Sequence, residues 1–239
     1  MTLENQVALV TGATRGIGRA IAKMFLQNKC SVVLCGREPR AVDQAVRELA
    51  AETGGKVAGK AADVRNYDQV RALFEFADSI GPLDVLVNNA GVGAFAPASQ
   101  LSVEDWLRVI ETNLNGAFFC AREALQRFTS ETARGGYIVN ISSLAGKNPF
   151  AGGAAYNASK FGMNGFSEAT MLDERYRGVR VSYIMPGSVA TEFGGPASGH
   201  SDDWKIQAED IAEIVQMLIR MPKRTLISRV EVRPSQPKR

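Results

Sequence analysis

The chain is poor in histidine and cysteine, and this limits the chemistry it can carry. Its 239 residues include one histidine, His200, and three cysteines, Cys30, Cys35 and Cys120. No metal-ligand spacing surrounds the histidine, and no nucleophile-elbow pattern accompanies it, so neither a metal site nor a hydrolytic triad is indicated. The cysteines sit in or beside apolar runs, which predicts three buried thiols and suits a reducing cytoplasm.

Long apolar runs and a strong charge of one sign are also missing. No stretch of eighteen apolar residues occurs, so we expect no membrane span, and residues 1–6 lack the features of a signal peptide. The net charge is +3, and basic residues cluster only at residues 229–239. Such a tail is more typical of a solvated end than of a nucleic-acid surface. We expect a cytoplasmic globular protein.

Apolar runs and helical patterns alternate along the chain. Strands are expected at 7–10, 31–35, 56–62, 84–87, 137–141, 179–185 and 225–232, and helices at 16–28, 39–52, 67–80, 102–128, 154–176 and 209–220. This rhythm predicts an α/β fold, a Rossmann-type doubly wound parallel sheet of about seven strands with helices on both faces. We expect a single domain over residues 1–239. Residues 188–205, rich in glycine and polar side chains, are predicted to form a lid over the site.

A glycine-rich turn, TGATRGIG, follows the first strand and opens the first helix. Strand, glycine turn and helix together favour dinucleotide binding, because the backbone can approach a pyrophosphate and the helix N-terminus offers free N–H groups. After the second strand stands Arg37, where an acid would hold the ribose hydroxyls of NAD and an arginine accommodates a 2′-phosphate. With Arg15 in the glycine turn, this predicts NADP(H). A turn without a ligand is the alternative on this motif alone.

A tyrosine and a lysine, Tyr156 and Lys160, stand one helical turn apart on one face of a predicted helix. An unperturbed tyrosine has a pKa of about 10, and a nearby ammonium favours the phenolate and lowers that pKa. The pair could therefore donate and accept the proton that carbonyl–alcohol interconversion requires. Taken alone, an exposed helical Tyr and Lys would be the better interpretation.

Further motifs accompany this pair in a fixed order. They are TGATRGIG at 11–18, Asp63-Val64, NNAG at 88–91, Asn113 in ETNLNG, Ser143 in IVNISS, YNASK at 156–160 and PGSVAT at 186–191. With these motifs the chain resembles the short-chain dehydrogenase/reductase family along most of its length. The carboxyl-terminal segment, residues 230–235, departs from the usual family ending.

The resemblance implies a role for each matched residue. Tyr156 would be the general acid in reduction, Ser143 would hold the substrate carbonyl, Lys160 would hold the nicotinamide ribose and lower the pKa of the tyrosine, and Asn113 would anchor a water leading protons to Lys160. The expected cofactor contacts, in addition to Tyr156 and Lys160, are Gly12, Thr14, Arg15, Gly16, Ile17, Gly18, Arg37, Asp63, Val64, Asn89, Ala90, Gly91, Pro186, Gly187, Val189 and Thr191.

The function expected is reduction of a ketone or other carbonyl by NADPH, similar to 3-oxoacyl-acyl-carrier-protein reductases. The alternatives are an NAD-dependent secondary-alcohol or polyol dehydrogenase and a non-catalytic dinucleotide sensor. Arg37 weighs against the first, and the complete set of matched catalytic residues weighs against the second.

Partners are expected to be few. An acyl-carrier-protein thioester is one candidate substrate, with Arg122 and Arg127 as candidate docking residues. Phe95, Phe150 and Phe193 are candidates for a substrate-facing wall, with core packing an equal alternative. We also expect a homo-oligomer, a tetramer or a dimer, formed through the helices around 113–128 and 155–176.

Overall fold

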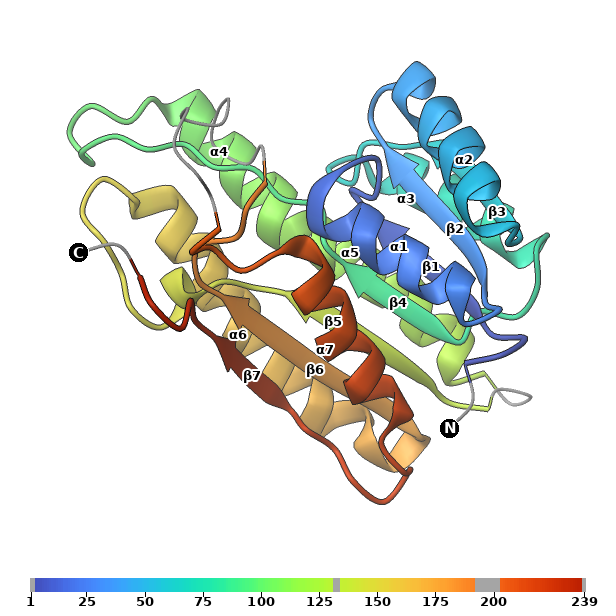
Figure 1. Ribbon diagram of the computed structural model, residues 1–239. Coiled ribbons are helices and arrows are strands. Elements are labelled where there is room, and N and C mark those ends of the chain that lie inside the picture. Colours follow the sequence, from blue (N-terminus) through green and yellow to red (C-terminus); the bar gives the residue numbers. More distant parts are fainter. Residues whose placement is uncertain (1–2, 131–133, 192–202, 238–239) are drawn as a thin grey trace.

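The computed structural model describes residues 3–130, 134–191 and 203–237 and is organised around one parallel sheet (Figure 1). Seven strands pair in the order β3-β2-β1-β4-β5-β6-β7, and every pairing is parallel. The strands are β1 Val7–Thr11, β2 Ser31–Gly36, β3 Val57–Ala61, β4 Val85–Asn88, β5 Gly136–Ile141, β6 Val179–Pro186 and β7 Arg229–Val232. The predicted doubly wound sheet is confirmed.

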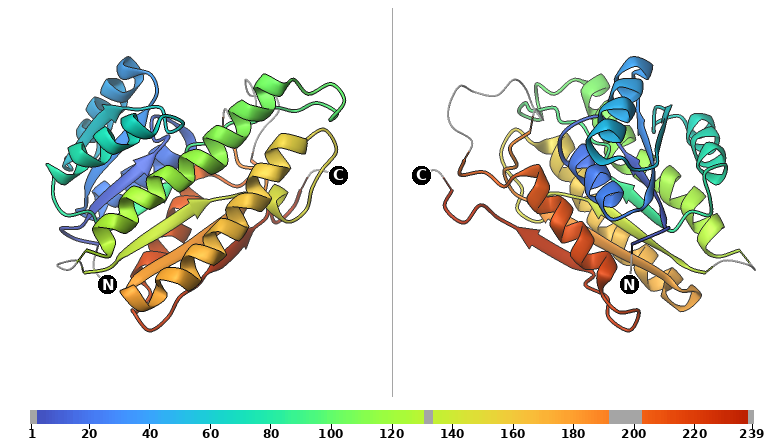
Figure 2. Two further views of the ribbon diagram at one scale, coloured as in Figure 1. Left: turned by 180° about the vertical axis from the view of Figure 1, so that it is seen from behind. Right: turned by 45° about the vertical axis from the view of Figure 1, so that its right-hand side comes forward.

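Helices cover both faces of the sheet. One core cluster joins the sheet to α1, α2 and α7, and the other joins it to α3, α5 and α6. Seen from behind, α5 and α6 lie side by side over the second face (Figure 2). The helices are α1 Gly16–Gln27, α2 Pro39–Thr53, α3 Tyr67–Asp78, α4 Val103–Ile110, α5 Gly116–Phe128, α6 Ala154–Glu174 and α7 Ala208–Arg220.

Local sequence signals account for most of these elements. Strand β1 is buried at every position, as a strand covered on both faces requires. Helix α2 begins with Pro39 in its first turn and ends at Gly54, whose φ of 64° is left-handed. Helix α4 begins after Ser102, whose side chain accepts a hydrogen bond from Asp105 N at 3.0 Å. All three cysteines are buried, as predicted.

The predicted helix over 102–128 is interrupted by one π-helical turn, Glu111–Asn115, between α4 and α5. There the backbone ladder widens, and Gly116 N bonds to Glu111 O, five residues back. The wider turn carries Asn113 with no exposed surface. Periodicity alone does not predict this change, because both helices on either side keep the ordinary spacing.

One other expectation needed correction. The last strand is shorter than predicted, since β7 begins at Arg229 and the chain before it turns at Pro222 to Thr225. Within α6, Gly162 lies close to Leu114, whereas a side chain on Gly165 would meet nothing within 4 Å.

The strand order reverses between β1 and β4, and ligands of such sheets bind outside the carboxyl ends of the strands at this point. Val189 and Ile206 form a parallel bridge that joins the two ends of the predicted lid. Phe193, His200 and the rest of 192–202 lie outside the described residues. Within the ranges that the structure describes, no helix has the length and apolar character needed to cross a membrane.

Candidate active site

The glycine turn between β1 and α1 is shaped by close backbone contacts. Gly12 has a φ of 62°, and a Cβ there would lie 2.8 Å from Ala90 Cα. Gly16, with a φ of 55°, opens α1 and faces Thr191. Left-handed backbone disfavours a side chain at both positions, and at Gly12 the close approach of Ala90 excludes one as well. The first turn of α1 carries no acid, so its N–H groups face a region suited to an anion.

Asn89 ties the end of β4 to the glycine turn. Its Nδ2 donates to Thr11 O and to Gly12 O, each at 2.9 Å. Thr11 Oγ1 in turn accepts from Asn89 N and Ala90 N, each at 3.0 Å. A Cβ on Gly18 would lie 2.4 Å from Asn89 Nδ2, so Gly18 is the residue that leaves room for this bond.

The neighbouring part of the turn packs toward the sheet. Thr14 lies against Gly36 at the end of β2, and Ile17 packs on the core beneath α1. The side chains of Arg15 and Arg37 are exposed. Because Thr11 pairs with Cys35, the two arginines follow neighbouring strands.

Asp63, at the end of β3, is held by an arginine that sequence reasoning missed. Arg65 Nε donates to Asp63 Oδ1 at 3.0 Å, and Arg65 Nη2 donates to Oδ2 at 2.6 Å. The hydrogen bonds from Arg65, aided by the charge of Arg37, hold the pKa of the Asp63 carboxyl below its usual range. Val64 is buried against Gly116. A basic residue directly after Asp63-Val64 was the available signal.

Tyr156 and Ser143 meet beyond the end of β5. Ser143 precedes a short 3-10 turn, Leu144–Gly146, and its Oγ accepts from Ala145 N at 3.1 Å. Burial raises the pKa of Tyr156 above its ordinary value, and a hydrogen bond with Ser143 partly offsets that rise. The direction is opposite to the expectation that Lys160 lowers this pKa, because removal from water dominates at this position.

Lys160 is buried on the same helix, one turn from the tyrosine. Its Nζ lies 5.7 Å from the centre of the Tyr156 ring and donates to Ile141 O at 2.9 Å. Burial lowers the pKa of the Lys160 amine to about 8. The ammonium form therefore still predominates at neutral pH, next to a phenol that keeps its proton.

Asn113 is joined to the catalytic helix through Ser159, a second residue that sequence reasoning missed. Asn113 Nδ2 donates to Val92 O at 2.9 Å and to Ser159 Oγ at 3.0 Å, while Val92 N donates to Asn113 Oδ1 at 2.8 Å. Ser159 Oγ donates to Tyr156 O at 2.8 Å. Gly91 also lies beside the Asn113 side chain. The serine inside YNASK was visible in the sequence, but its partner was not.

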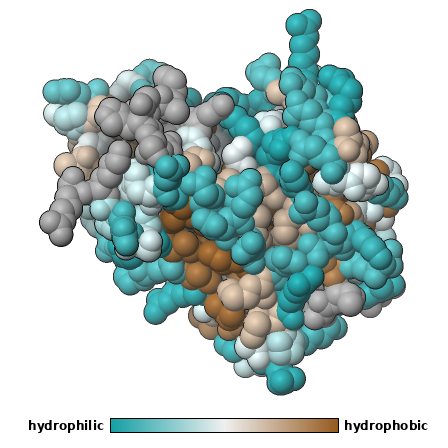
Figure 3. Space-filling model, in the orientation of Figure 1, coloured by the Kyte–Doolittle hydropathy of each residue, from teal (hydrophilic) through white to brown (hydrophobic). Residues whose placement is uncertain are grey.

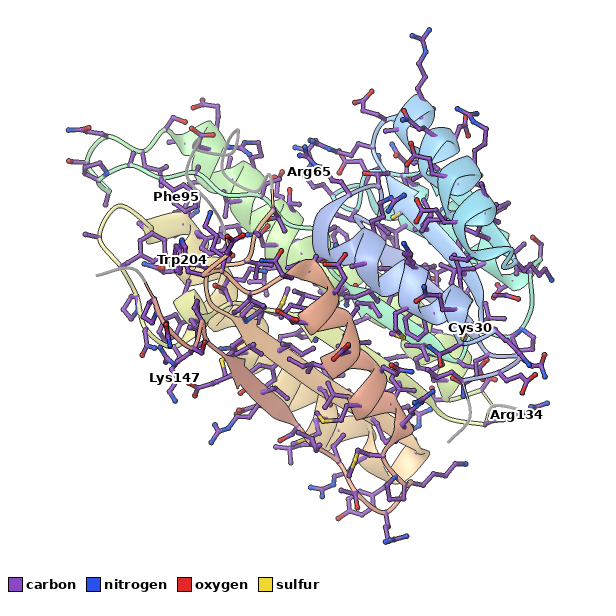
Figure 4. The ribbon with its side chains drawn as sticks, viewed as in Figure 1. Cys30, Arg65, Phe95, Arg134, Lys147 and Trp204 are labelled. Atoms are coloured by element: carbon purple, nitrogen blue, oxygen red, sulfur yellow. The ribbon has the colours of Figure 1, made fainter. Side chains whose placement is uncertain are left out.

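The end of β6 completes the site. Pro186 is its last, buried residue, and Gly187 N donates to Val232 O of β7 at 2.8 Å. Val189 packs on the core, and Thr191 lies against Gly16. The carboxyl edge of the sheet thus brings together predicted residues from the ends of β1 to β6, from the π-helical turn and from α6. In Figure 4, Arg65 and Phe95 lie at this edge, whereas Arg134, which precedes β5, lies at the opposite one.

The two arginines considered for a carrier protein lie elsewhere, on α5, and are already paired. Arg122 bonds to the hydroxyl of Tyr67. Arg127 binds Asp78 through Nη2 at 2.7 Å and Glu123 through Nη1 at 3.0 Å. Within the described ranges no group of three or more His, Cys, Asp or Glu side chains is arranged to hold a metal ion.

Comparison with known proteins agrees with this geometry. A family model described as short chain dehydrogenase matches residues 6–201. The 3beta-hydroxysteroid dehydrogenase of Mediterraneibacter gnavus is 42% identical over 212 residues, covering 87% of this chain and 74% of that protein. The 3-oxoacyl-acyl-carrier-protein reductase of Chlamydia muridarum is 36% identical over 204 residues, covering 85% of this chain and 80% of that protein. A solved metagenomic short-chain oxidoreductase in complex with NADP has a TM-score of 0.84 at 37% identity, covering 99% of this chain and 100% of that chain.

Proposed function

Because this chain belongs to the short-chain dehydrogenase family, whose members are oxidoreductases acting on alcohol or carbonyl groups, we propose that it uses NADPH to reduce a ketone to a secondary alcohol. The observation that carries the proposal is the meeting of Ser143, Tyr156 and Lys160 at the sheet edge that also holds the glycine turn. A protein that only bound a dinucleotide would not need a half-buried phenol hydrogen-bonded to a serine.

The residues present fit a dinucleotide. Gly12 and Gly16 leave backbone open in the turn, and the first helical turn of α1 offers N–H groups without a competing acid. Asn89 and Thr191 frame the turn on either side. When bound, NADPH supplies the hydride; the chain supplies position and the proton.

The proton would come from the Tyr156 hydroxyl. Because burial raises the pKa of this group, it stays protonated at neutral pH and can donate to a carbonyl oxygen. Ser143, hydrogen-bonded to the same hydroxyl, is placed to donate to that oxygen as well. The Lys160 ammonium, buried below the ring, would stabilise the phenolate that remains after transfer.

Asn113 would act by holding this assembly. Both of its amide hydrogens are committed, one to Val92 O and one to Ser159 Oγ. A water on the path to Lys160 would therefore bind at an Asn113 carbonyl oxygen, and the main-chain carbonyl group is favoured because a π-helical turn disturbs the regular backbone ladder.

The preference for NADPH rests on the two arginines that follow neighbouring strands. A 2′-phosphate between Arg15 and Arg37 would gain charge-assisted hydrogen bonds. No acid stands at residues 35–37, where it would repel that phosphate. The alternative function is the reverse reaction, oxidation of an alcohol by an NAD-dependent dehydrogenase. No contact among the described residues favours it.

The 3-oxoacyl thioester remains one substrate to be tested. The relative in Chlamydia muridarum supports it, but Arg122 and Arg127 do not, because both are engaged in pairs between α3 and α5. An acidic carrier protein would have to break these pairs to use them.

Turnover of NADPH against a panel of ketones, diketones, acetoacetyl thioesters and polyols tests the proposal. We expect at least one ketone to be reduced with NADPH as the cofactor, and the same reaction to be slow with NADH. Oxidation of a polyol by NAD without any ketone reduction would instead support the dehydrogenase.

A further inference from the structure

Two exposed phenylalanines stand beside the catalytic tyrosine. The centre of the Phe95 ring lies 5.8 Å from that of Tyr156 in an edge-on contact, and 5.9 Å from that of Phe150. Phe95 is 50% exposed and Phe150 is 46% exposed. Core packing therefore does not explain them. We refer to Phe95, Phe150 and Tyr156 as the aromatic wall.

Specific backbone contacts build this wall from two distant loops. Ala96 N donates to Gly152 O at 2.9 Å, and Ala96 pairs with Gly153 in a parallel bridge. Asn157 Nδ2 donates to Phe150 O at 2.9 Å, which fixes that loop to α6. A Cβ on Gly153 would lie 2.7 Å from the Phe150 ring, so glycine makes room for it.

Arg108, which bonds to the first loop, and Lys147, which lies in the second, are each paired with an acid. Arg108 Nη2, which reaches Gly93 O, also donates to Asp105 Oδ1 at 2.6 Å. Lys147, at the start of the second loop, is paired with Glu231 of β7. A carboxylate, sulfonate or phosphate on the substrate would have to compete for these charges. Trp204 lies at the same end of the molecule as Phe95 and adds a further aromatic side chain (Figure 4).

We propose that the preferred substrate is a ketone carrying a flat apolar ring next to the carbonyl, with the ring packed on the aromatic wall. This inference rests on the proposed ketone reduction and specifies its substrate class. With the carbonyl oxygen at Tyr156, its substituent lies within reach of Phe95. Aromatic rings pair with centres about 4.5–7 Å apart, and the two contacts within the wall already follow that geometry, so a substrate ring would extend the series.

The test compares two diketones that differ in one group, 1-phenyl-1,2-propanedione and 2,3-butanedione, in the parent and in Phe95→Leu and Phe150→Leu. Leucine keeps an apolar side chain but removes the ring. Each variant should lose about tenfold in kcat/KM for the phenyl diketone, the effect of about 1.4 kcal/mol, and change by less than about twofold for butanedione. Tyr176→Leu, at a ring 92% exposed beyond the far end of α6, is the matched control.

A second measurement does not depend on turnover. Calorimetric titration of the phenyl diketone, with oxidised NADP present so that no reduction occurs, should show the same tenfold weakening in both variants. Equal losses for the two diketones would overturn the inference, because the rings would then act on Tyr156 alone. A parent that reduces butanedione without preferring the phenyl diketone would refute the inference and leave ketone reduction standing. If the parent reduces neither diketone nor any other ketone of the panel, the proposed function fails, and the titration still shows whether the phenyl diketone binds to the aromatic wall.

Discussion

Asn113 and Ser159 share a buried hydrogen bond of 3.0 Å that links the π-helical turn after α4 to the catalytic helix α6. Ser159 Oγ in turn donates a hydrogen bond to Tyr156 O at 2.8 Å. Neither residue has exposed surface. The position of the tyrosine thus depends on a polar contact between two helices that are distant in sequence.

Replacing Ser159 tests this link. Ser159→Ala leaves an amide hydrogen of Asn113 buried without a partner, which costs about 1–3 kcal/mol of unfolding free energy. We expect kcat to fall while KM for the ketone changes little, because Ser159 positions Tyr156 rather than the substrate. Steady-state kinetics and urea unfolding measure the two effects. Ser159→Cys, whose thiol is a weaker acceptor and donor than the hydroxyl, should restore part of both. A kcat equal to that of the parent in the alanine variant would argue against the link.

Removing the Tyr156 hydroxyl should abolish catalysis without unfolding the protein. In Tyr156→Phe the ring contact with Phe95 is kept. Loss of a general acid lowers turnover by roughly 100-fold or more. NADPH consumption with the best ketone of the panel measures the loss, and fluorescence titration with NADPH confirms that the cofactor still binds. Activity within about twofold of the parent would remove Tyr156 from the mechanism.

Arg37 should decide between the two dinucleotides. Each charge-assisted contact to a 2′-phosphate is worth roughly 1.5–3 kcal/mol, so Arg37→Ala should weaken NADPH binding by about ten- to a hundredfold. NADH, which lacks that phosphate, should bind as before. Dissociation constants for both cofactors give the answer, with Arg47→Ala, an exposed arginine on α2, as the control. Tighter NADH binding in the parent would reverse the assignment.

Lys160 should leave a signature in the pH dependence of stability without cofactor. Burial lowers its pKa to about 8 in the folded protein, against about 10.4 for an unperturbed lysine. Between these values the unfolded chain holds more protons, so the contribution of Lys160 to the free energy of unfolding rises with pH. It is fully present above the unfolded value and is lost as pH falls through the folded one.

Comparing Tyr156→Phe with the double variant Tyr156→Phe, Lys160→Met isolates this contribution, because the tyrosine nearest to Lys160 is absent from both. Urea unfolding at several pH values between about 7 and 10 should show the protein that keeps Lys160 gaining stability relative to the double variant. A difference that is flat over this range would mean that the folded lysine titrates normally.

Apolar side chains on the helices behind the sheet predict a homo-oligomer. Phe118 of α5 and Phe161 of α6 are each 45% exposed, and the Phe118 ring contacts Phe166. On the other face, an apolar patch runs along α7 and β7 (Figure 3), with Met217 partly exposed. Two such surfaces are compatible with a tetramer. Light scattering at micromolar concentration should give a mass above that of one chain.

A double variant locates the interface. Phe118→Asp with Phe161→Asp should lower the mass, since charges in an apolar contact oppose association. Tyr176→Asp, at a fully solvated ring, should not. A monomeric parent would contradict the prediction.

The sequence by itself determined the fold and which of the predicted residues lie together at the carboxyl edge of the sheet. Continuous apolar strands, the glycine turn and the caps at Ser102 and Gly54 act over a few residues, so their pattern can be read along the chain. The motifs at strand ends then had to meet, because parallel strands place their carboxyl ends at one edge. Most boundaries agree with the structure to within about two residues.

Only the tertiary structure decided how the site is tuned. It turned Asn113 inward through a π-helical turn, gave it Ser159 as a partner, and placed Arg65 on Asp63. It also reversed the expected direction of the Tyr156 pKa, because loss of water outweighs a lysine whose Nζ bonds to Ile141 O. Exposure of Phe95 depends likewise on which loops pack together. Burial and contacts between distant segments arise only when the chain packs, so the spacing of residues along the sequence does not predict them.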